Sequence, residues 1–199
     1  MNKTIEYYNE NAKSYFDNTV NADMAEHYER FLKYLPKGSY ILDVGCGSGR
    51  DSKYFLSLGY HVKAIDGSIQ MCELASKYIG QTVENIIFNE ISYENEFNGI
   101  WACASLLHAD KGDLKTIINQ LKKALKERGI MYVSFKYGDS DRIQSERYFN
   151  DQNEESIKKL LKDFIIKELW LSDDVRPGRN DRWINVVAEK IDIDSEEQT

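Results

Sequence analysis

The sequence has little of what marks several classes of protein. It has only three cysteines, Cys46, Cys72 and Cys103, in 199 residues, and they are widely separated. Neither a disulfide framework nor a CxxC metal pair is therefore predicted, and we expect reduced, mostly buried thiols and no metal site. There is no internal repeat or low-complexity stretch. No run of about 18 apolar residues could span a bilayer, and the first residues lack the apolar core of a signal peptide, so a cytoplasmic location is expected.

Positive charge is also scarce. Lysine and arginine number 26 against 33 aspartates and glutamates, which gives a formal net charge of -7. Such a balance disfavours non-specific binding to phosphate backbones and to anionic membranes, so we expect no DNA partner and no membrane partner. The oligomeric state is left open by the sequence. At this length a single domain over residues 1–199 is predicted.

The apolar pattern alternates between strand and helix. Two helices are predicted between residues 2 and 35, and residues 1–36 are expected to form a helical cap within the domain. Predicted strands and helices then alternate, with strands at 40–44, 60–65, 85–88, 99–104 and 129–135 and helices at 50–58, 68–79 and 113–125. A helix at 154–161 precedes two apolar strands at 165–171 and 183–188. The pattern predicts a doubly wound, Rossmann-like α/β fold with a seven-stranded, mostly parallel sheet and a C-terminal antiparallel hairpin.

A glycine-rich turn follows the first predicted strand. Residues 43–50 read DVGCGSGR, a D-x-G-x-G-x-G pattern that ends at Arg50. Alternate glycines let the chain turn tightly and let a ligand lie against bare backbone. The second strand is followed by Asp66, close to the usual separation for a carboxylate that accepts the hydroxyls of a ribose. A ligand that carries a ribose is therefore predicted at the carboxyl ends of these strands.

The turn departs from the dinucleotide fingerprint G-x-G-x-x-G, because Arg50 stands where the third glycine would be. A phosphate-binding G-x-x-x-x-G-K-[ST] segment is also absent from the sequence. The segment instead resembles the corresponding turn of class I S-adenosylmethionine-dependent methyltransferases, over about residues 40–190. The run from Cys46 to Ser52 is especially similar to the tellurite-resistance methyltransferase group.

This resemblance implies S-adenosylmethionine as the cofactor. It places Asp43 and the backbone of Gly45 and Gly47 near the methionine ammonium, with Cys46 in the same turn. In the tellurite-resistance group, an arginine at the place of Arg50 can meet the cofactor carboxylate; an exposed arginine in the first turn of the helix is the alternative. The remaining residues expected around the ribose and adenine are Asp66, Gly67, Ser68, Met71 and Glu90. Met71 is equally compatible with a plain core position, and Glu90 is preferred to its neighbour Asn89 for the adenine amino group.

Candidate residues for the methyl acceptor come from other parts of the chain. His108 follows the fourth main strand and could serve as a base or orient the acceptor, since its unperturbed pKa is near 6.5; a capping or loop role is the alternative. Arginine forks match carboxylate and phosphate oxygens, so a small, anionic substrate is predicted. The residues expected to bind it are Tyr15, Lys136, Arg176, Arg179 and Arg182, with solvated loop charges as the alternative.

Three other functions remain open at this stage. An RNA or protein methyltransferase is compatible with the turn, whereas the [DNS]-P-P-[YFW] and Pro-Cys motifs of DNA methyltransferases are absent. A non-catalytic protein that binds an adenosyl cofactor would keep the same turn. An NAD-dependent oxidoreductase is less favoured because of Arg50.

Overall fold

A seven-stranded sheet forms the centre of the structure, a computed structural model that describes residues 3–191. Its strands are β1 (Tyr40–Val44), β2 (His61–Asp66), β3 (Glu84–Asn85), β4 (Phe97–Ala102), β5 (Leu125–Lys136), β8 (Phe164–Asp173) and β9 (Arg182–Lys190). They lie in the order β3-β2-β1-β4-β5-β9-β8. The neighbours β3, β2, β1, β4 and β5 pair in parallel, and β9 is antiparallel to β5 and β8. The predicted Rossmann-like sheet with its C-terminal antiparallel hairpin is confirmed.

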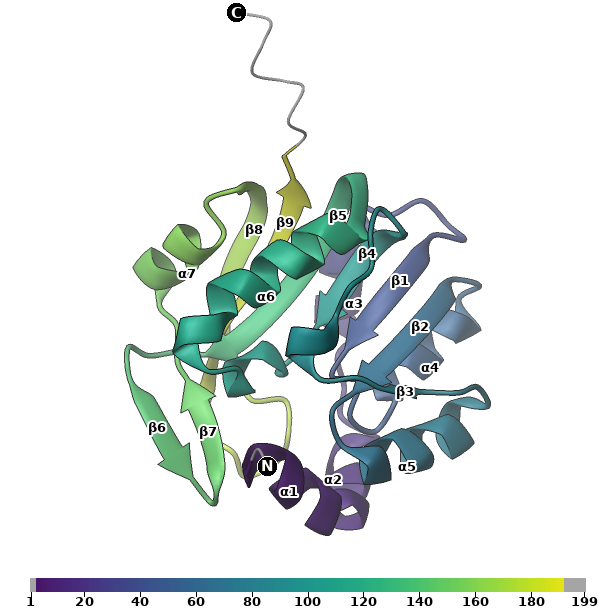
Figure 1. Cartoon of the computed structure of the whole chain (residues 1–199), viewed down its shortest axis with the longest axis vertical. Coiled ribbons are helices and arrows are strands. Elements are labelled where there is room, and N and C mark those ends of the chain that lie inside the picture. The colour runs from purple at the N-terminus through teal and green to yellow at the C-terminus, as the bar shows by residue number, and fades with distance from the viewer. Residues whose placement is uncertain (1–2, 192–199) are drawn as a thin grey trace, which may run out of the picture.

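Helices cover both faces of this sheet (Figure 1). One face carries α3 (Ala25–Leu32), α4 (Arg50–Ser57) and α5 (Ile69–Ile79), and the other carries α6 (Lys111–Ala124) and α7 (Glu154–Leu160). Because side chains alternate along a strand, Ile41 of β1 belongs to the core under α3 and α4, whereas Leu42 belongs to the core under α6. Both layers therefore depend on the same short strand.

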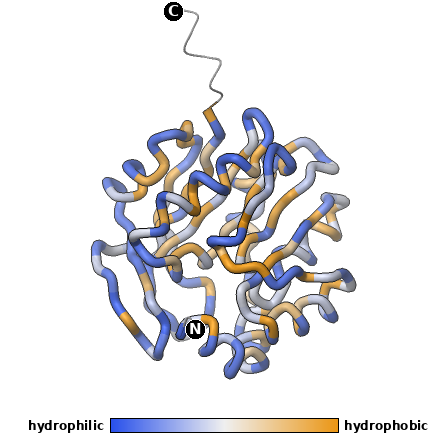
Figure 2. Tube along the Cα trace, viewed as in Figure 1, coloured by the Kyte–Doolittle hydropathy of each residue, from blue (hydrophilic) through white to orange (hydrophobic). Residues whose placement is uncertain are grey.

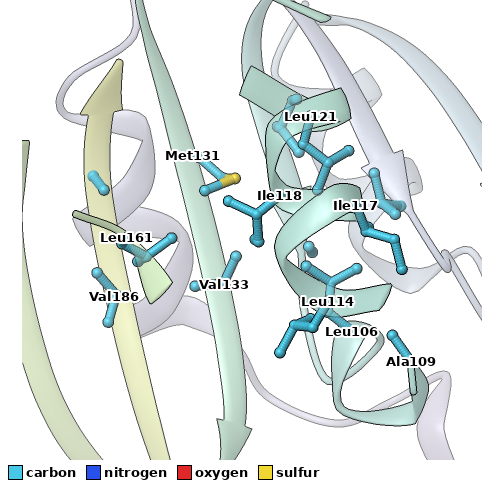
Figure 3. Close-up of a cluster of buried hydrophobic side chains, with 14 of the residues drawn as sticks. Leu106, Ala109, Leu114, Ile117, Ile118, Leu121, Met131, Val133, Leu161 and Val186 are labelled. Atoms are coloured by element: carbon cyan, nitrogen blue, oxygen red, sulfur yellow. The ribbon is translucent and has the colours of Figure 1, made fainter. Parts of the chain in front are cut away.

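The apolar stripe of α6 shows why the sequence folds this way. Its buried residues are Leu114, Ile117, Ile118, Leu121 and Ala124, which recur at helical spacing. Figure 3 shows this stripe facing Met131 and Val133 of β5. Each fully buried aliphatic side chain contributes roughly 1.5–3 kcal/mol. Figure 2 shows the same division along the chain, with apolar residues on the inner strands of the seven-stranded sheet and alternating polar and apolar residues on α6.

The first two helices, α1 (Lys3–Glu10) and α2 (Ala12–Thr19), cover the carboxyl ends of the parallel strands. In Figure 1 they lie between α5 and a small hairpin of β6 (Asp141–Gln144) and β7 (Arg147–Asn150). Hydrogen bonds hold α1 in place on both sides. The Ser68 hydroxyl at the start of α5 donates to Asn9 Oδ1 at 2.7 Å, and the Tyr148 N–H of β7 donates to Thr4 Oγ1 at 3.1 Å.

Three details differ from the predicted elements. Three helices precede β1 instead of two, because the first predicted helix is interrupted at Asn11, whose side-chain amide donates to the Tyr7 carbonyl. The β6–β7 hairpin was not predicted. The third strand is shorter and earlier than expected, and a 3-10 turn, η1 (Phe88–Glu90), follows it. Among residues 3–191, no helix has the length and apolarity needed to cross a membrane.

Candidate functional site

The glycine-rich turn after β1 brings bare backbone against the end of β4. Gly45 and Gly47 have φ angles of 70° and 54°, in the left-handed region that L side chains rarely adopt. A Cβ built on Gly45 would lie 2.5 Å from Ser105 Cβ, so no larger residue fits at this position without a shift. Ser105 itself is buried, and its hydroxyl has no hydrogen-bond partner among the described residues.

Asp66, the last residue of β2, is held from two sides. Its Oδ2 accepts the Gly47 N–H at 2.9 Å, and its Oδ1 accepts the Ser68 N–H at 2.8 Å. Burial raises the pKa of Asp66, and the two N–H groups oppose that rise. The carboxylate is therefore fixed in orientation beside the glycine-rich turn.

Two adjoining cavities open at this edge of the sheet. The first cavity is lined by residues that include Asp66, Gly67, Ser68, Met71 and Asn89. The second cavity is lined by residues that include Cys46, Arg50, Lys136, Arg147, Arg176 and Arg179. Six residues line both and mark the junction between them: Tyr8, Tyr15, Gly45, Gly47, Ala104 and His108. Helices α1 and α2 supply the two tyrosines, so the cap forms part of both walls.

Three of the predicted site residues do not line either cavity. Asp43 is 1% exposed and lies beneath the turn. The Glu90 carboxylate turns back to the Ile87 N–H at 3.3 Å within its own 3-10 turn, and its neighbour Asn89 lines the first cavity instead. Arg182 is exposed, and its guanidinium lies 5.6 Å from the ring centroid of Tyr137.

A buried network underlies the second cavity. Asp51 accepts hydrogen bonds from Arg50 Nε at 2.6 Å, from Trp101 Nε1 at 2.8 Å and from the Tyr28 hydroxyl at 2.5 Å. Although burial would raise it, these donors and the Arg50 charge hold the pKa of Asp51 below its ordinary value. Arg50 therefore lines the cavity with two of its nitrogens already bound to Asp51.

Asp43 lies next to this network and has a single side-chain hydrogen-bond donor among residues 3–191. Its Oδ2 accepts the Ser52 hydroxyl at 2.6 Å. Burial and the negative charge of Asp51 raise the pKa of Asp43 well above its ordinary value. The pKa values of these two buried carboxyl groups thus move in opposite directions, because Asp51 has Arg50 and two further donors whereas Asp43 has the Ser52 hydroxyl.

At the junction of the cavities, His108 is bound through both ring nitrogens. Nδ1 lies 2.7 Å from the Tyr148 carbonyl oxygen, which only accepts, so Nδ1 carries the proton of the neutral ring. Nε2 lies 2.8 Å from the Tyr8 hydroxyl, which therefore donates to it. Burial lowers the pKa of His108 to about 4 and raises the pKa of Tyr8. The Tyr8 oxygen accepts one long hydrogen bond, of 3.5 Å, from Arg147 Nη1 and can accept another.

Two residues of this site were absent from the sequence-based candidates for binding or catalysis. The sequence placed Tyr8 only as an aromatic residue at helical spacing, which does not distinguish a binding role from packing. No sequence pattern pointed to Arg147, because it lies on β7, a strand that the apolar pattern did not predict.

Comparisons with known proteins agree with this geometry. Residues 41–129 match the family model described as a methyltransferase domain. Ribosomal protein L11 methyltransferase of Campylobacter concisus is 26% identical over 170 residues, covering 80% of this chain and 50% of the relative. The structure of 1,6-didemethyltoxoflavin-N1-methyltransferase from Burkholderia thailandensis, with 1,6-didemethyltoxoflavin and S-adenosylhomocysteine bound, has a TM-score of 0.77 at 21% identity, covering 94% of this chain and 85% of that one. The structure of TehB from Haemophilus influenzae has a TM-score of 0.73 at 16% identity, covering 90% of this chain and 67% of that one.

The fold is that of the class I methyltransferases, and the matched domain contains the glycine-rich turn, Asp66 and His108. The predicted resemblance to class I S-adenosylmethionine-dependent methyltransferases is confirmed, and TehB shares this fold. The chain spans between about a third and just over half of the length of the curated relatives it matches.

Proposed function

We propose that this protein binds S-adenosylmethionine and transfers its methyl group to a small, anionic molecule. The observation that carries the proposal is the Asp66 carboxylate, fixed between the Gly47 and Ser68 N–H groups at the wall of the first cavity. A carboxylate in this position after the second strand is suited to accept ribose hydroxyls.

The other residues of the first cavity fit an adenosyl group. Met71, Ile87 and Ile117 supply apolar surface for a flat base. Asn89 offers an amide near them, and the buried Ser105 hydroxyl lacks a partner among the described residues. Gly45 and Gly47 leave the junction open for the methionine portion, and Arg50 lies beyond them in the second cavity.

S-adenosylmethionine would supply an electrophilic methyl group on a sulfonium. The chain's own part is to align the cofactor with the methyl acceptor and to exclude water. An in-line displacement gains much of its rate from the positioning of its reactants. We propose that Tyr8 accepts a hydrogen bond from the methyl-accepting N–H or O–H group at the junction. His108 accepts the hydrogen bond of the Tyr8 hydroxyl and so orients the Tyr8 oxygen toward the acceptor.

A small acceptor is supported by the elements that surround the second cavity. Helices α1 and α2 and the loop between β8 and β9 all line it. Its lining includes Lys136, Arg176 and Arg179, which were predicted to receive an anion. The relative from Burkholderia thailandensis holds a small molecule, 1,6-didemethyltoxoflavin, which is a precedent for an acceptor of this size.

The other functions are distinguishable by experiment. We propose to incubate the protein with S-adenosylmethionine and a panel of small amines and alcohols that carry a carboxylate or phosphate, and to measure S-adenosylhomocysteine release. Release with at least one acceptor, reduced at least tenfold in Asp66→Asn and retained in the exposed-site variant Asp139→Asn, supports the proposal. Cofactor binding without release from this panel or from an RNA and peptide panel would favour a non-catalytic binding protein.

A further inference from the structure

The lining of the second cavity includes one half-buried arginine, Arg147, whose charge no carboxylate in residues 3–191 neutralises. Arg50 pairs with Asp51, Arg176 pairs with Asp174 at 2.5 Å, and Lys136 pairs with Asp181 at 3.0 Å. Each of these three predicted anion-binding groups is thus already neutralised by an aspartate. Arg147 forms no ion pair with any carboxylate in this part of the chain.

Aromatic rings fix the Arg147 guanidinium in place. Its Cζ lies 4.5 Å from the ring centroid of Tyr7, 5.2 Å from that of Phe149 and 5.8 Å from that of Tyr8. Stacking of this kind orients the guanidinium without supplying a counter-charge. The group is held at the wall of the second cavity, beside the junction.

The hydrogen-bonding capacity of Arg147 is largely unused. Its Nε is buried and has no partner among the described residues, and Nη1 makes one long hydrogen bond, of 3.5 Å, to the Tyr8 hydroxyl. A buried unsatisfied N–H on a charged group is costly, and the cost is removed when a ligand oxygen accepts from it. Arginine presents Nε and Nη as a fork that matches two oxygens of one anion.

From these observations we infer that Arg147 is the residue that binds the oxyanion of the methyl acceptor. This inference rests on the proposed function and narrows it: the acceptor carries a carboxylate or phosphate group, and the adjacent Tyr8 oxygen lies beside its nucleophilic N–H or O–H. Arg179 is the other lining cation without an aspartate partner among residues 3–191, and it is exposed, as is the acidic lining residue Asp173. An anion at Arg147 is less screened by water than an anion at Arg179.

The test uses protein saturated with S-adenosylhomocysteine, titrated with acetate, benzoate and inorganic phosphate while the Arg147 Nε–H signal is followed by NMR. Benzamide serves as the neutral counterpart of benzoate. We expect a saturable shift with at least one oxyanion and none with benzamide, and the acetate and phosphate arms separate a carboxylate site from a phosphate site. Arg147→Gln should weaken oxyanion binding at least tenfold, whereas Arg182→Gln, which removes the same charge outside the cavity, should change it less than twofold.

Failure of this inference is distinct from failure of the proposed function. Binding of S-adenosylhomocysteine is measured separately by calorimetry on the same variants, and its absence in the wild type would refute the cofactor site itself. If the wild type binds S-adenosylhomocysteine but no oxyanion saturates the Arg147 signal, the inference is overturned. It is equally overturned if Arg179→Gln, and not Arg147→Gln, removes oxyanion binding.

Discussion

Tyr8 on α1 and His108 after β4 stand 100 residues apart in the sequence and share a hydrogen bond of 2.8 Å between the tyrosine hydroxyl and Nε2. The bond ties the N-terminal cap to the carboxyl end of the sheet at the junction of the two cavities. Because the other ring nitrogen lies 2.7 Å from the Tyr148 carbonyl oxygen, neutral His108 takes the Nδ1–H tautomer.

His108 is therefore expected to remain neutral over the physiological range. With its pKa lowered to about 4 by burial, it should show the Nδ1–H tautomer in NMR spectra from pH 8 down to pH 5. The His108→Gln variant assigns its signal among those of the three histidines. Since the unfolded chain binds this proton near pH 6.5, the contribution of His108 to folding stability is lost as the pH falls from about 6.5 toward 4. A titration midpoint between pH 6 and 7 would contradict this reading.

Asp43 is expected to weaken the fold progressively as the pH rises from about 4 to about 8. Its pKa is raised above that of the unfolded chain, so the folded state holds a proton that the unfolded state has released, and stability falls as the pH rises above about 4. Asp43→Asn removes that ionisation while keeping the shape of the side chain. At pH 8 the variant should be more stable than the wild type by at least about 1 kcal/mol in urea denaturation, with a smaller gain at pH 5.

The exposed-site variant Asp139→Asn is the control for Asp43→Asn, and it should show neither gain. An equal gain at both pH values would mean that ionisation of Asp43 is not the cause.

A comparison of Gly45 with Gly38 separates two losses of unfolding free energy on substitution by alanine: the strain of a side chain at positive φ, and the steric clash of its Cβ. Both have φ near +70°, but a Cβ on Gly38 meets nothing within 4 Å, whereas one on Gly45 meets Ser105 Cβ at 2.5 Å. Gly38→Ala should lower the free energy of unfolding by about 1 kcal/mol, and Gly45→Ala by at least twice as much. Chemical denaturation measures both. Equal losses would show that β1 and β4 tolerate the added methyl group at this turn.

The sheet and the first cavity were predictable because their signals are local. Apolar runs identify β1 and β5, and the glycine spacing with Asp66 after the second strand identifies the ligand site. In contrast, the β6–β7 hairpin has mostly polar strands, and its one aliphatic residue, Ile143, is 75% exposed. Its turn places Ser145 and Glu146 at positive φ, without the Asn-Gly or Asp-Gly pair that marks such turns.

The second cavity was only partly predictable because its chemistry depends on pairing in space. Lys136, Arg176 and Arg182 were equivalent cations in the sequence. In the structure Lys136 and Arg176 are neutralised by aspartates, and Arg182 lies outside the cavity. Glu90 and Asn89 were adjacent candidates, and in the structure Asn89 lines the first cavity whereas the Glu90 carboxylate accepts the Ile87 N–H. No pattern in one sequence reports which of several charged residues has a partner.

The cofactor site is tested most directly by isothermal titration calorimetry with S-adenosylhomocysteine, using NADH as the competing ligand and Asp66→Ala as the matched variant. The structure predicts micromolar binding of S-adenosylhomocysteine to the wild type, at least tenfold weaker binding to a folded Asp66→Ala, and no comparable binding of NADH. Tight binding of NADH without binding of S-adenosylhomocysteine would contradict the assignment and restore the oxidoreductase alternative.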